Sequence, residues 1–184
     1  MTVLQDRGAL LEGHFRLSSG RHSDRFVQKF RILEDPALLG PMARAIAQSF
    51  AKVRPTIVVS AAVGGIVLGY EVARALHVNA IFVEKQDGAP ALRRGFALNA
   101  DDRALIVEDV VTTGGSVREV IDVVRAHGAA VAGVGAIVQR GAAEFGVPFF
   151  ALLDLPIVSY APEECPQCRA QTPLADPGSR RLAP

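Results

Sequence analysis

Residues 104–116 read ALIVEDVVTTGGS, and this stretch predicts the fold of the chain. The four apolar residues 104–107 are typical of a buried central strand, and Glu108 and Asp109 follow them directly. Open α/β sheets bind ligands at the carboxyl ends of their strands. We therefore expect the acidic pair at a ligand-binding edge, where carboxylates suit hydroxyl groups or a hydrated metal ion. Two adjacent acids alone would also fit an ordinary strand end.

The second half of the stretch predicts a phosphate site. Residues 112–116 offer hydroxyls and unhindered backbone N–H groups just before a helix, whose N-terminus carries partial positive charge. Ser116 and Glu119 fit the capping-box pattern for the start of that helix, and His127 with Gly128 marks its end. A phosphate monoester fits this combination.

Apolar strands alternate with helical patterns through the middle of the chain. Asp35 and Pro36 predict a helix start, and strands are expected at residues 57–59, 80–83, 104–107, 131–138 and 149–153. Strands separated by helices indicate an α/β fold with a parallel sheet of about five strands flanked by helices. We expect a single domain made of an N-terminal section (1–33), an α/β core (34–158) and a C-terminal tail (159–184).

Two further segments offer groups for an anionic ligand. In the turn SAAVGG at residues 60–65, Gly64 and Gly65 would let a diphosphate approach main-chain N–H groups, although tight strand-to-helix packing explains them equally. Residues 84–98 are too long and polar for a tight connection, which predicts a mobile loop or β-arm. Its cations could stabilise a leaving group, or the segment could be a solvated hairpin.

Composition narrows the function classes. The chain has 184 residues, is 49% hydrophobic and carries a net charge of +1, without a basic run, so we expect no nucleic-acid partner. No apolar run approaches the ~20 residues that span a bilayer, and the first residues do not resemble a signal peptide. We expect a cytoplasmic protein with no membrane partner. Neither the Gly-x-x-x-x-Gly-Lys nor the Gly-x-Gly-x-x-Gly phosphate motif occurs.

Cys165 and Cys168 form one Cys-x-x-Cys pair, which is half of a tetrahedral zinc site. A structural tail, zinc completed by residues elsewhere, and a local disulfide all remain open. The histidines show no ligand-like spacing, and we expect most of them to be solvated or capping groups: His14, His22, His77 and His127.

Residues 104–116 resemble the 5-phosphoribosyl 1-diphosphate (PRPP) signature of type I phosphoribosyltransferases. The resemblance implies that Glu108 and Asp109 hold the ribose hydroxyls, that the following loop surrounds the 5-phosphate, and that Mg²⁺ rides on PRPP with no firm protein ligand. It implies catalytic roles for Glu108, Asp109, Lys85 and Arg93. The implied PRPP-binding residues are Gly64, Gly65, Lys85, Arg94, Glu108, Asp109, Val110, Val111, Thr112, Thr113, Gly114, Gly115 and Ser116.

The string GHFRLSSGRHS at residues 13–23 resembles the opening of the orotate phosphoribosyltransferase family, and EKQDG (84–88), LRRGF (92–96) and Arg140 align with later features. This implies transfer of phosphoribosyl from PRPP to orotate in pyrimidine biosynthesis. It also implies an N-terminal hood and a homodimer whose mobile loop reaches the neighbouring active site. Phe26 would lie against the orotate ring and Arg140 would pair with its carboxylate. The implied orotate-binding residues are Ser18, Ser19, Gly20, Phe26, Lys29, Thr112 and Arg140.

Two positions depart from this resemblance. Many family members carry lysine where Ser18 and Gly64 stand, and Lys29 or Arg21 could supply the missing charge. Phe26 would also fit ordinary core packing, and Arg140 a surface charge at a strand end. Two other functions remain open: a phosphoribosyltransferase for another base such as a purine, and a non-enzymatic PRPP sensor with an added nucleic-acid-binding part.

Overall fold

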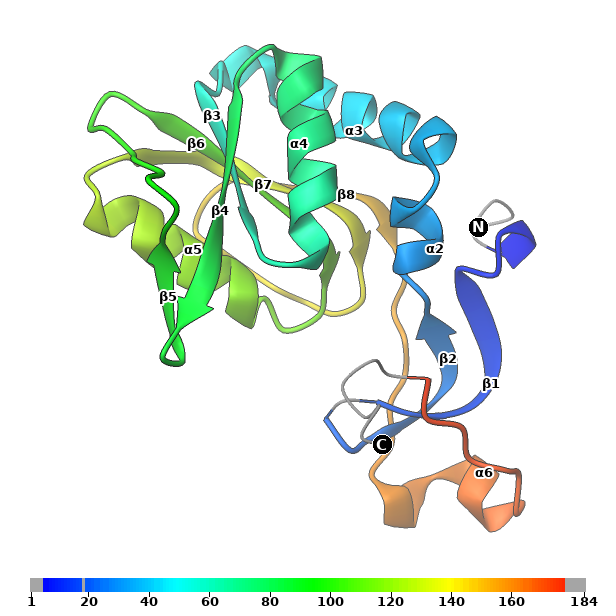
Figure 1. Ribbon diagram of the computed structural model, residues 1–184. Helices are drawn as coiled ribbons and strands as arrows, with labels where there is room; N and C mark the ends of the chain where they lie inside the picture. Colours follow the sequence, from blue (N-terminus) through cyan, green and yellow to red (C-terminus); the bar gives the residue numbers. More distant parts are fainter. Residues whose placement is uncertain (1–4, 18, 178–184) are drawn as a thin grey trace. The chain divides into compact units, whose positions relative to one another are not determined.

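The structure is a computed structural model that describes residues 5–17 and 19–177 (Figure 1). The chain forms two compact units. The core unit consists of residues 33–155. The small unit joins the described residues up to Ile32 with those from Pro156 onward, so the two ends of the chain belong to one unit.

One six-stranded sheet organises the core unit, in the order β5-β4-β3-β6-β7-β8 (Figure 1). The five predicted strands are present and parallel, which confirms the predicted fold class. The sixth strand, β5, is antiparallel to β4 and lies in the segment predicted as a loop or arm. The strands are β3 (Ile57–Ala61), β4 (Asn79–Gln86), β5 (Ala89–Leu92), β6 (Arg103–Val111), β7 (Ala130–Gln139) and β8 (Phe149–Asp154).

Helices cover both faces of this sheet (Figure 1). Successive strand residues point to opposite faces, so each face carries apolar side chains that pack against helices. Val59, Ile106 and Val134 belong to the apolar cluster that includes the buried side of α5 (Gly115–Ala126). On the other face, Gly133 and Gly135 of β7 leave room for side chains of α3 (Pro36–Phe50), which also packs on α4 (Gly64–Leu76). Two short helical turns, α2 (Phe30–Leu33) and η1 (Ala51–Val53), flank α3.

The two predicted helix starts have different outcomes. Asp35 caps α3 as predicted, because its Oδ1 accepts hydrogen bonds from the N–H groups of Ala37 (2.9 Å) and Leu38 (3.3 Å). The predicted capping box of α5 is wrong. Its N-cap is Gly114, no side chain among the described residues caps it, and Glu119 instead pairs with Lys85. Its predicted end is confirmed at the C-cap His127.

The small unit is built on an antiparallel hairpin of β1 (Leu10–Arg16) and β2 (His22–Val27), with a register shift between Glu12 and Phe15. The tail contributes η2 (Pro162–Glu164) and α6 (Pro166–Arg169). It pairs with both strands: Tyr160 exchanges two 2.8 Å backbone hydrogen bonds with His22, and Ala175 bonds to His14 and Arg16, each at 2.8 Å. The hairpin and the tail are thus one folded piece.

In the part of the chain that the structure describes, no helix combines the length and the apolar character needed to cross a bilayer.

Candidate functional site

The strand order of the core unit reverses between β3 and β6. From β3 the chain crosses through α4 to β4 on one side, and from β6 it crosses through α5 to β7 on the other. Such a switch point leaves a crevice outside the carboxyl ends of the two strands, where α/β proteins bind ligands. The two turns that the sequence predicts for phosphate groups follow these two strands.

The acidic pair lies within β6, whereas the sequence predicted it after a strand of residues 104–107. Pairing with β3 stops at Val107, but pairing with β7 continues through Val110 and Val111. Glu108 and Asp109 therefore begin where β6 has lost its β3 neighbour. Glu108 is half-buried and Asp109 is only 2% exposed. Their carboxylates accept hydrogen bonds from the backbone N–H groups of Asp109 (3.1 Å) and Val110 (2.7 Å).

The loop after β6 forms a hollow at the start of α5. Glu108 and residues 110–117 line a pocket of ≈ 230 Å³, in which Thr112, Thr113 and Ser116 are exposed. Gly114 has φ +78°, and a Cβ there would lie 2.7 Å from the Phe145 ring. Only glycine fits this position without strain, because the left-handed backbone and the ring both exclude a side chain. The pocket thus lies at the N-terminus of α5 and is lined by hydroxyl-bearing residues and glycines, a setting that suits a phosphate group.

Two residues that support this loop carry no signal in the sequence. Arg118 donates from Nη1 to the carbonyl of Thr113 (2.6 Å) and from Nη2 to the carbonyl of Glu144 (3.1 Å). Its guanidinium also lies 5.5 Å from the centroid of the Phe145 ring. Arg118 and Phe145 therefore fix the loop against residues 143–146. Their separation of 27 positions along the chain hides the contact from any local pattern.

The turn after β3 lies against the acidic pair. A Cβ on Gly65 would lie 3.1 Å from Cβ of Ser60, 3.2 Å from the Val107 carbonyl oxygen and 3.5 Å from Oε1 of Glu108. Gly65 therefore serves the close strand-to-helix packing that was one of its two predicted roles. The peptide bond between Ala62 and Val63 in this turn is cis. The structure thus brings the turn of residues 60–65 and Glu108 to the same edge of the sheet.

Residues 84–98 contain the predicted β-arm. Strands β4 and β5 join through Asp87 and Gly88, both at positive φ, as in a two-residue hairpin turn. Lys85 Nζ lies 2.6 Å from Oε1 of Glu119 in α5, the helix that starts at the loop. Arg94 makes two 3.0 Å hydrogen bonds to the Glu84 carboxylate, and Arg93 lies 3.9 Å from it. Lys85 thus reaches α5, whereas Arg93 and Arg94 pair within their own segment.

Arg140 follows β7 at the same edge as the loop. Its backbone N–H donates to the Val111 carbonyl (2.8 Å), while its Nε is buried and has no hydrogen-bond partner among the described residues. Burial lowers the pKa of Arg140 from its ordinary value, but a guanidinium remains protonated at neutral pH. A half-buried cation with such an Nε fits an anionic ligand group.

Apart from Arg140 and Thr112, the residues assigned to orotate belong to the small unit. Phe26 is half-buried, with its ring centroid 5.9 Å from that of Phe15. Lys29 Nζ lies 5.6 Å from the centroid of the Phe30 ring. Arg21, one of the two cations suggested as a replacement for lysine, donates to Oγ (2.9 Å) and the carbonyl of Ser159 (2.6 Å). Ser18 lies outside the described residues, and Ser19 and Gly20 follow it.

A pocket larger than the one at the loop lies elsewhere on the core unit. A pocket of ≈ 540 Å³ lies at the other end of the sheet, beside Ile57 and Asn79, the first residues of β3 and β4. Its one charged lining residue, Arg74, pairs with Glu71 at 2.7 Å. This pocket lacks carboxylates and a phosphate loop, so the crevice at the carboxyl ends of the strands is the better candidate.

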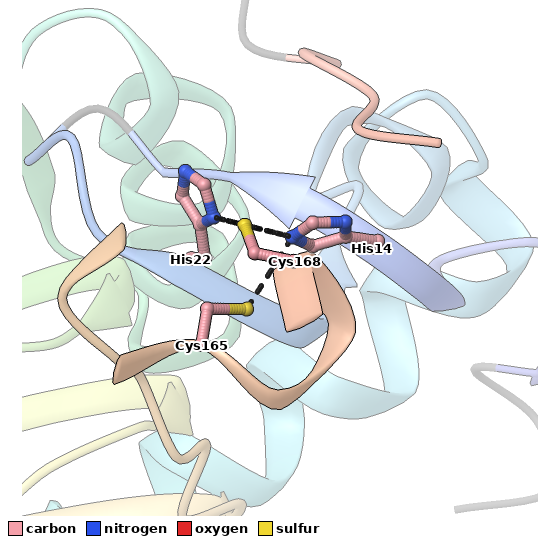
Figure 2. Close-up of side chains that lie close together, drawn as sticks. All are labelled: His14, His22, Cys165 and Cys168. Carbon is pink, nitrogen blue, oxygen red and sulfur yellow. Dashed lines mark hydrogen bonds between the residues drawn. The ribbon is translucent and has the colours of Figure 1, made fainter. Parts of the chain in front are cut away.

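The prediction for the histidines is half right. His77 and His127 stand at helix C-caps, as expected of capping groups. His14 and His22 are 3% and 5% exposed, so the prediction of solvated or capping groups is wrong for them. Both lie against Cys165 and Cys168, which are free thiols (Figure 2). Burial, followed by repulsion from His14 and Arg16, lowers the pKa of His22 and favours its neutral form.

Known proteins resemble the whole chain. The phosphoribosyl transferase domain family matches residues 31–147, which contain both turns and the acidic pair. Proteins named orotate phosphoribosyltransferase from Pelotomaculum thermopropionicum and Heliobacterium modesticaldum are 48% and 49% identical. The first alignment covers 99% of this chain and 97% of the relative, and the second 98% and 96%. This chain belongs to the orotate phosphoribosyltransferase family.

A solved member of the orotate phosphoribosyltransferase family has the same fold. The crystal structure from Aeropyrum pernix matches with a TM-score of 0.68 and 28% identity, over 84% of this chain and 92% of that one. The resemblance read from residues 13–23 and 104–116 is thereby confirmed at the level of the family.

Proposed function

We propose that this chain transfers the 5-phosphoribosyl group from PRPP to orotate, which yields orotidine 5-phosphate and diphosphate in pyrimidine biosynthesis. The observation that carries the proposal is the juxtaposition of the acidic pair with a phosphate-sized loop at the switch point between β3 and β6. Relatives named for this activity match the chain at 48–49% identity over nearly its full length.

The loop and the acidic pair bind opposite ends of the phosphoribosyl group. Backbone N–H groups and hydroxyls of residues 112–116 surround the 5-phosphate at the N-terminus of α5. Glu108 and Asp109 accept hydrogen bonds from the ribose hydroxyls, because ionised carboxylates are strong acceptors for such groups. The reaction is a substitution at the anomeric carbon, in which the base nitrogen forms a bond as diphosphate departs. Positioning and charge stabilisation supply the catalysis, and Asp109 forms no covalent bond.

The negative charge of the departing diphosphate is stabilised by cations, and the arm of residues 84–98 carries Lys85, Arg93 and Arg94. Lys85 and Glu119 are 57% and 41% exposed, and such surface ion pairs contribute at most about 1 kcal/mol. Lys85 can therefore leave Glu119 for a diphosphate oxygen at little cost. Arg93 and Arg94 are exposed cations of the same arm, but their partner Glu84 is only 16% exposed, so Lys85 is the more readily released. The turn with Gly64 and Gly65 receives the diphosphate at its backbone. We include in the proposal a homodimer in which the arm serves the neighbouring site.

Mg²⁺ fits the donor set of this edge, since it prefers one or two carboxylates together with substrate phosphates and waters. Glu108 and Asp109 are the carboxylates at hand. When bound with PRPP, the ion neutralises diphosphate charge. Glu108 and Asp109 orient the ribose through its hydroxyl groups.

Recognition of orotate requires a cation for its carboxylate. Arg140 is proposed for this role because its buried Nε has no hydrogen-bond partner among the described residues of the chain. Phe26, Lys29, Thr112 and residues 18–20 are assigned to the base by family resemblance. The planar guanidinium of Arg140 matches a carboxylate in two parallel hydrogen bonds, which lysine could not reproduce.

The first test is the absorbance change of orotate with purified protein, PRPP and Mg²⁺, with adenine, guanine, xanthine and uracil followed by product chromatography. We expect consumption of orotate alone, dependent on both PRPP and Mg²⁺. Turnover of another base would retain the PRPP site and overturn the base assignment. PRPP binding without any turnover would identify a sensor.

Asp109→Asn tests the ribose role. The variant keeps the shape of the side chain but weakens its acceptance of two hydroxyls, so kcat/KM for PRPP should fall at least about 100-fold with unchanged thermal unfolding. Asp122→Asn on the exposed face of α5 is the matched control and should retain full activity. Normal turnover by Asp109→Asn would remove the acidic pair from the mechanism.

Arg140→Ala tests carboxylate recognition separately. The KM for orotate should rise at least about tenfold, while the KM for PRPP changes much less, because only orotate loses a charged partner. Equal increases in both constants would show that Arg140 supports the loop rather than binding the base.

A further inference from the structure

The small unit contains a cluster of four potential metal ligands outside the PRPP site. His14 and His22 come from the two strands of the hairpin, and Cys165 and Cys168 come from the tail (Figure 2). All four ligand atoms lie within 4.8 Å of one another. We propose that this His2Cys2 cluster is a structural zinc site that fastens the C-terminal tail to the N-terminal hairpin.

The fold of the hairpin explains why the two histidines face the same space. Arg16 of β1 pairs with His22 of β2, and His14 lies two residues before Arg16. His14 falls within the register shift between Glu12 and Phe15, and its side chain meets that of His22 on one side of the hairpin (Figure 2). Their ring centroids are 5.0 Å apart.

The tail brings the two thiols onto that face. Cys165 is the N-cap residue of α6 and Cys168 lies in its single turn. Gln167, between them, donates from its side chain to the Gly13 carbonyl (2.9 Å), which ties α6 to β1 beside His14. Together with the backbone hydrogen bonds of Tyr160 and Ala175 to the hairpin, this contact holds the two cysteines next to the histidines.

Four of the six distances between the ligand atoms are close to those of a tetrahedron around one ion. Zinc bonds of about 2.0–2.1 Å to nitrogen and 2.3 Å to sulfur place two nitrogens about 3.3 Å apart, and a nitrogen and a sulfur about 3.5 Å apart. His14 Nε2 lies 3.1 Å from His22 Nδ1, 3.4 Å from Cys165 Sγ and 3.6 Å from Cys168 Sγ. His22 Nδ1 lies 3.2 Å from Cys168 Sγ.

A second contact orients His14 as a ligand. Its Nδ1 lies 2.9 Å from the Thr172 carbonyl oxygen, an acceptor to which only an N–H can donate. The proton therefore resides on Nδ1, and the lone pair of Nε2 points into the cluster. Metal-bound histidines typically have such a partner on their other ring nitrogen, which fixes tautomer and ring orientation.

The ligand set selects the metal. Two thiolates and two imidazoles in tetrahedral array are typical of structural zinc, whereas Mg²⁺ prefers oxygen ligands. On binding, both S–H bonds break, the two protons pass to solvent, and two Zn–S bonds form, so the complex of Zn²⁺ with two thiolates is neutral. All four positions are taken by protein, which makes the site structural rather than catalytic.

The small unit has a physical need for such a site. Its described residues form a two-stranded hairpin and short helical turns, and hairpins of this size are marginal without further support. Small domains commonly gain stability from a metal when their apolar core is limited. Here the ion would join the two ends of the chain.

The decisive measurement is metal content of the full chain, expressed without a histidine tag and purified with reductant but without chelator. Plasma mass spectrometry should find about one zinc per chain, and Zn-edge absorption spectroscopy should find two sulfur and two nitrogen neighbours. The double variant Cys165→Ser, Cys168→Ser should lose at least about tenfold in zinc content. His77→Asn, at the exposed C-cap of α4, is the matched control and should keep all of it.

A cobalt titration of the unmutated chain tests the same site without the double variant, in case that variant misfolds. The stripped wild-type chain titrated with Co²⁺ should develop the visible bands of a four-coordinate ion and a near-ultraviolet thiolate band, saturating at one equivalent and reversed by Zn²⁺. Absence of zinc and of this spectrum would overturn the proposal, as would a Cys165–Cys168 disulfide in the purified chain or full zinc content in the double variant. None of these readouts depends on orotate turnover.

Discussion

The two units of the molecule differ in how far their buried side chains are apolar, since three of the small unit's described buried residues are polar and only Ser60 and Asp109 are polar in the larger core unit. In the core unit, Val59, Ile106 and Val134 fill the space between the sheet and α5, and each is at most 1% exposed. In the small unit, the buried set includes His14, His22 and Ser23, whose polar atoms need specific partners. A large sheet can be stabilised by apolar burial alone, whereas a hairpin and a tail depend on a few directional contacts. The two units should therefore respond differently to substitution.

Ile106→Ala should have the largest effect on stability. Removing a fully buried side chain in the centre of β6 should lower the free energy of unfolding by about 2–5 kcal/mol, measured by urea denaturation. Val67→Ala, which truncates a half-exposed side chain on α4, should cost less than about 0.5 kcal/mol. Amide exchange should accelerate in β3, β6 and β7 more than in β1 and β2. Equal acceleration everywhere would show that the two units unfold as one.

A pair of glycine substitutions compares the backbones of the two units. Gly114→Ala combines a left-handed φ with a Cβ 2.7 Å from the Phe145 ring, so it should cost about 2–4 kcal/mol. Gly20→Ala in the small unit has a similar φ of +81° but no atom within 4 Å of the new Cβ, and should cost only about 1–2 kcal/mol. Thermal unfolding of both variants measures the difference. A larger loss for Gly20→Ala would contradict the denser packing of the core unit.

Asp35→Ala should have a moderate effect confined to the core unit. Loss of the two N-cap hydrogen bonds of α3 should lower the unfolding free energy by about 1 kcal/mol, and Asp35→Ser should restore most of it. Hydrogen exchange of the first turn of α3 is the local readout. Faster exchange at the hairpin amides would argue that α3 also supports the small unit.

Glu119→Gln should have the smallest effect. Its partner Lys85 is exposed, so the stability change should stay within about 1 kcal/mol and shrink as salt rises. Chemical denaturation at low and high salt measures it. A loss of several kcal/mol would mean that the arm is fixed to α5, and that Lys85 is too firmly held to serve diphosphate.

The sequence predicted what local patterns determine. Apolar runs located all five parallel strands, Asp35 with Pro36 located the start of α3, and the acids and glycines of residues 104–116 located the loop of the candidate site. Each of these features depends on neighbours along the chain. The end of β6 was less predictable, because β7 extends it past the point where β3 stops.

Features formed by distant residues were missed. The capping box failed because Gly114, in the left-handed conformation, is the N-cap of α5, two residues before Ser116. The histidines showed no ligand-like spacing because their partners are far away in the sequence. His22 lies 146 positions from Cys168, and His14 lies 151 positions from Cys165. Only the pairing of tail and hairpin brings them together.

That pairing also sets an order of events during synthesis. His14 leaves the ribosome 151 positions before Cys165, a delay of roughly 8–30 s at 5–20 residues per second. The whole of the core unit is made within this interval and can fold first, while the hairpin waits for tail residues that are made after the core unit. The hairpin is thus made before the core unit but reaches its final structure after it. A ribosome that stops before Cys165 releases a complete sheet with a hairpin that lacks its tail partners.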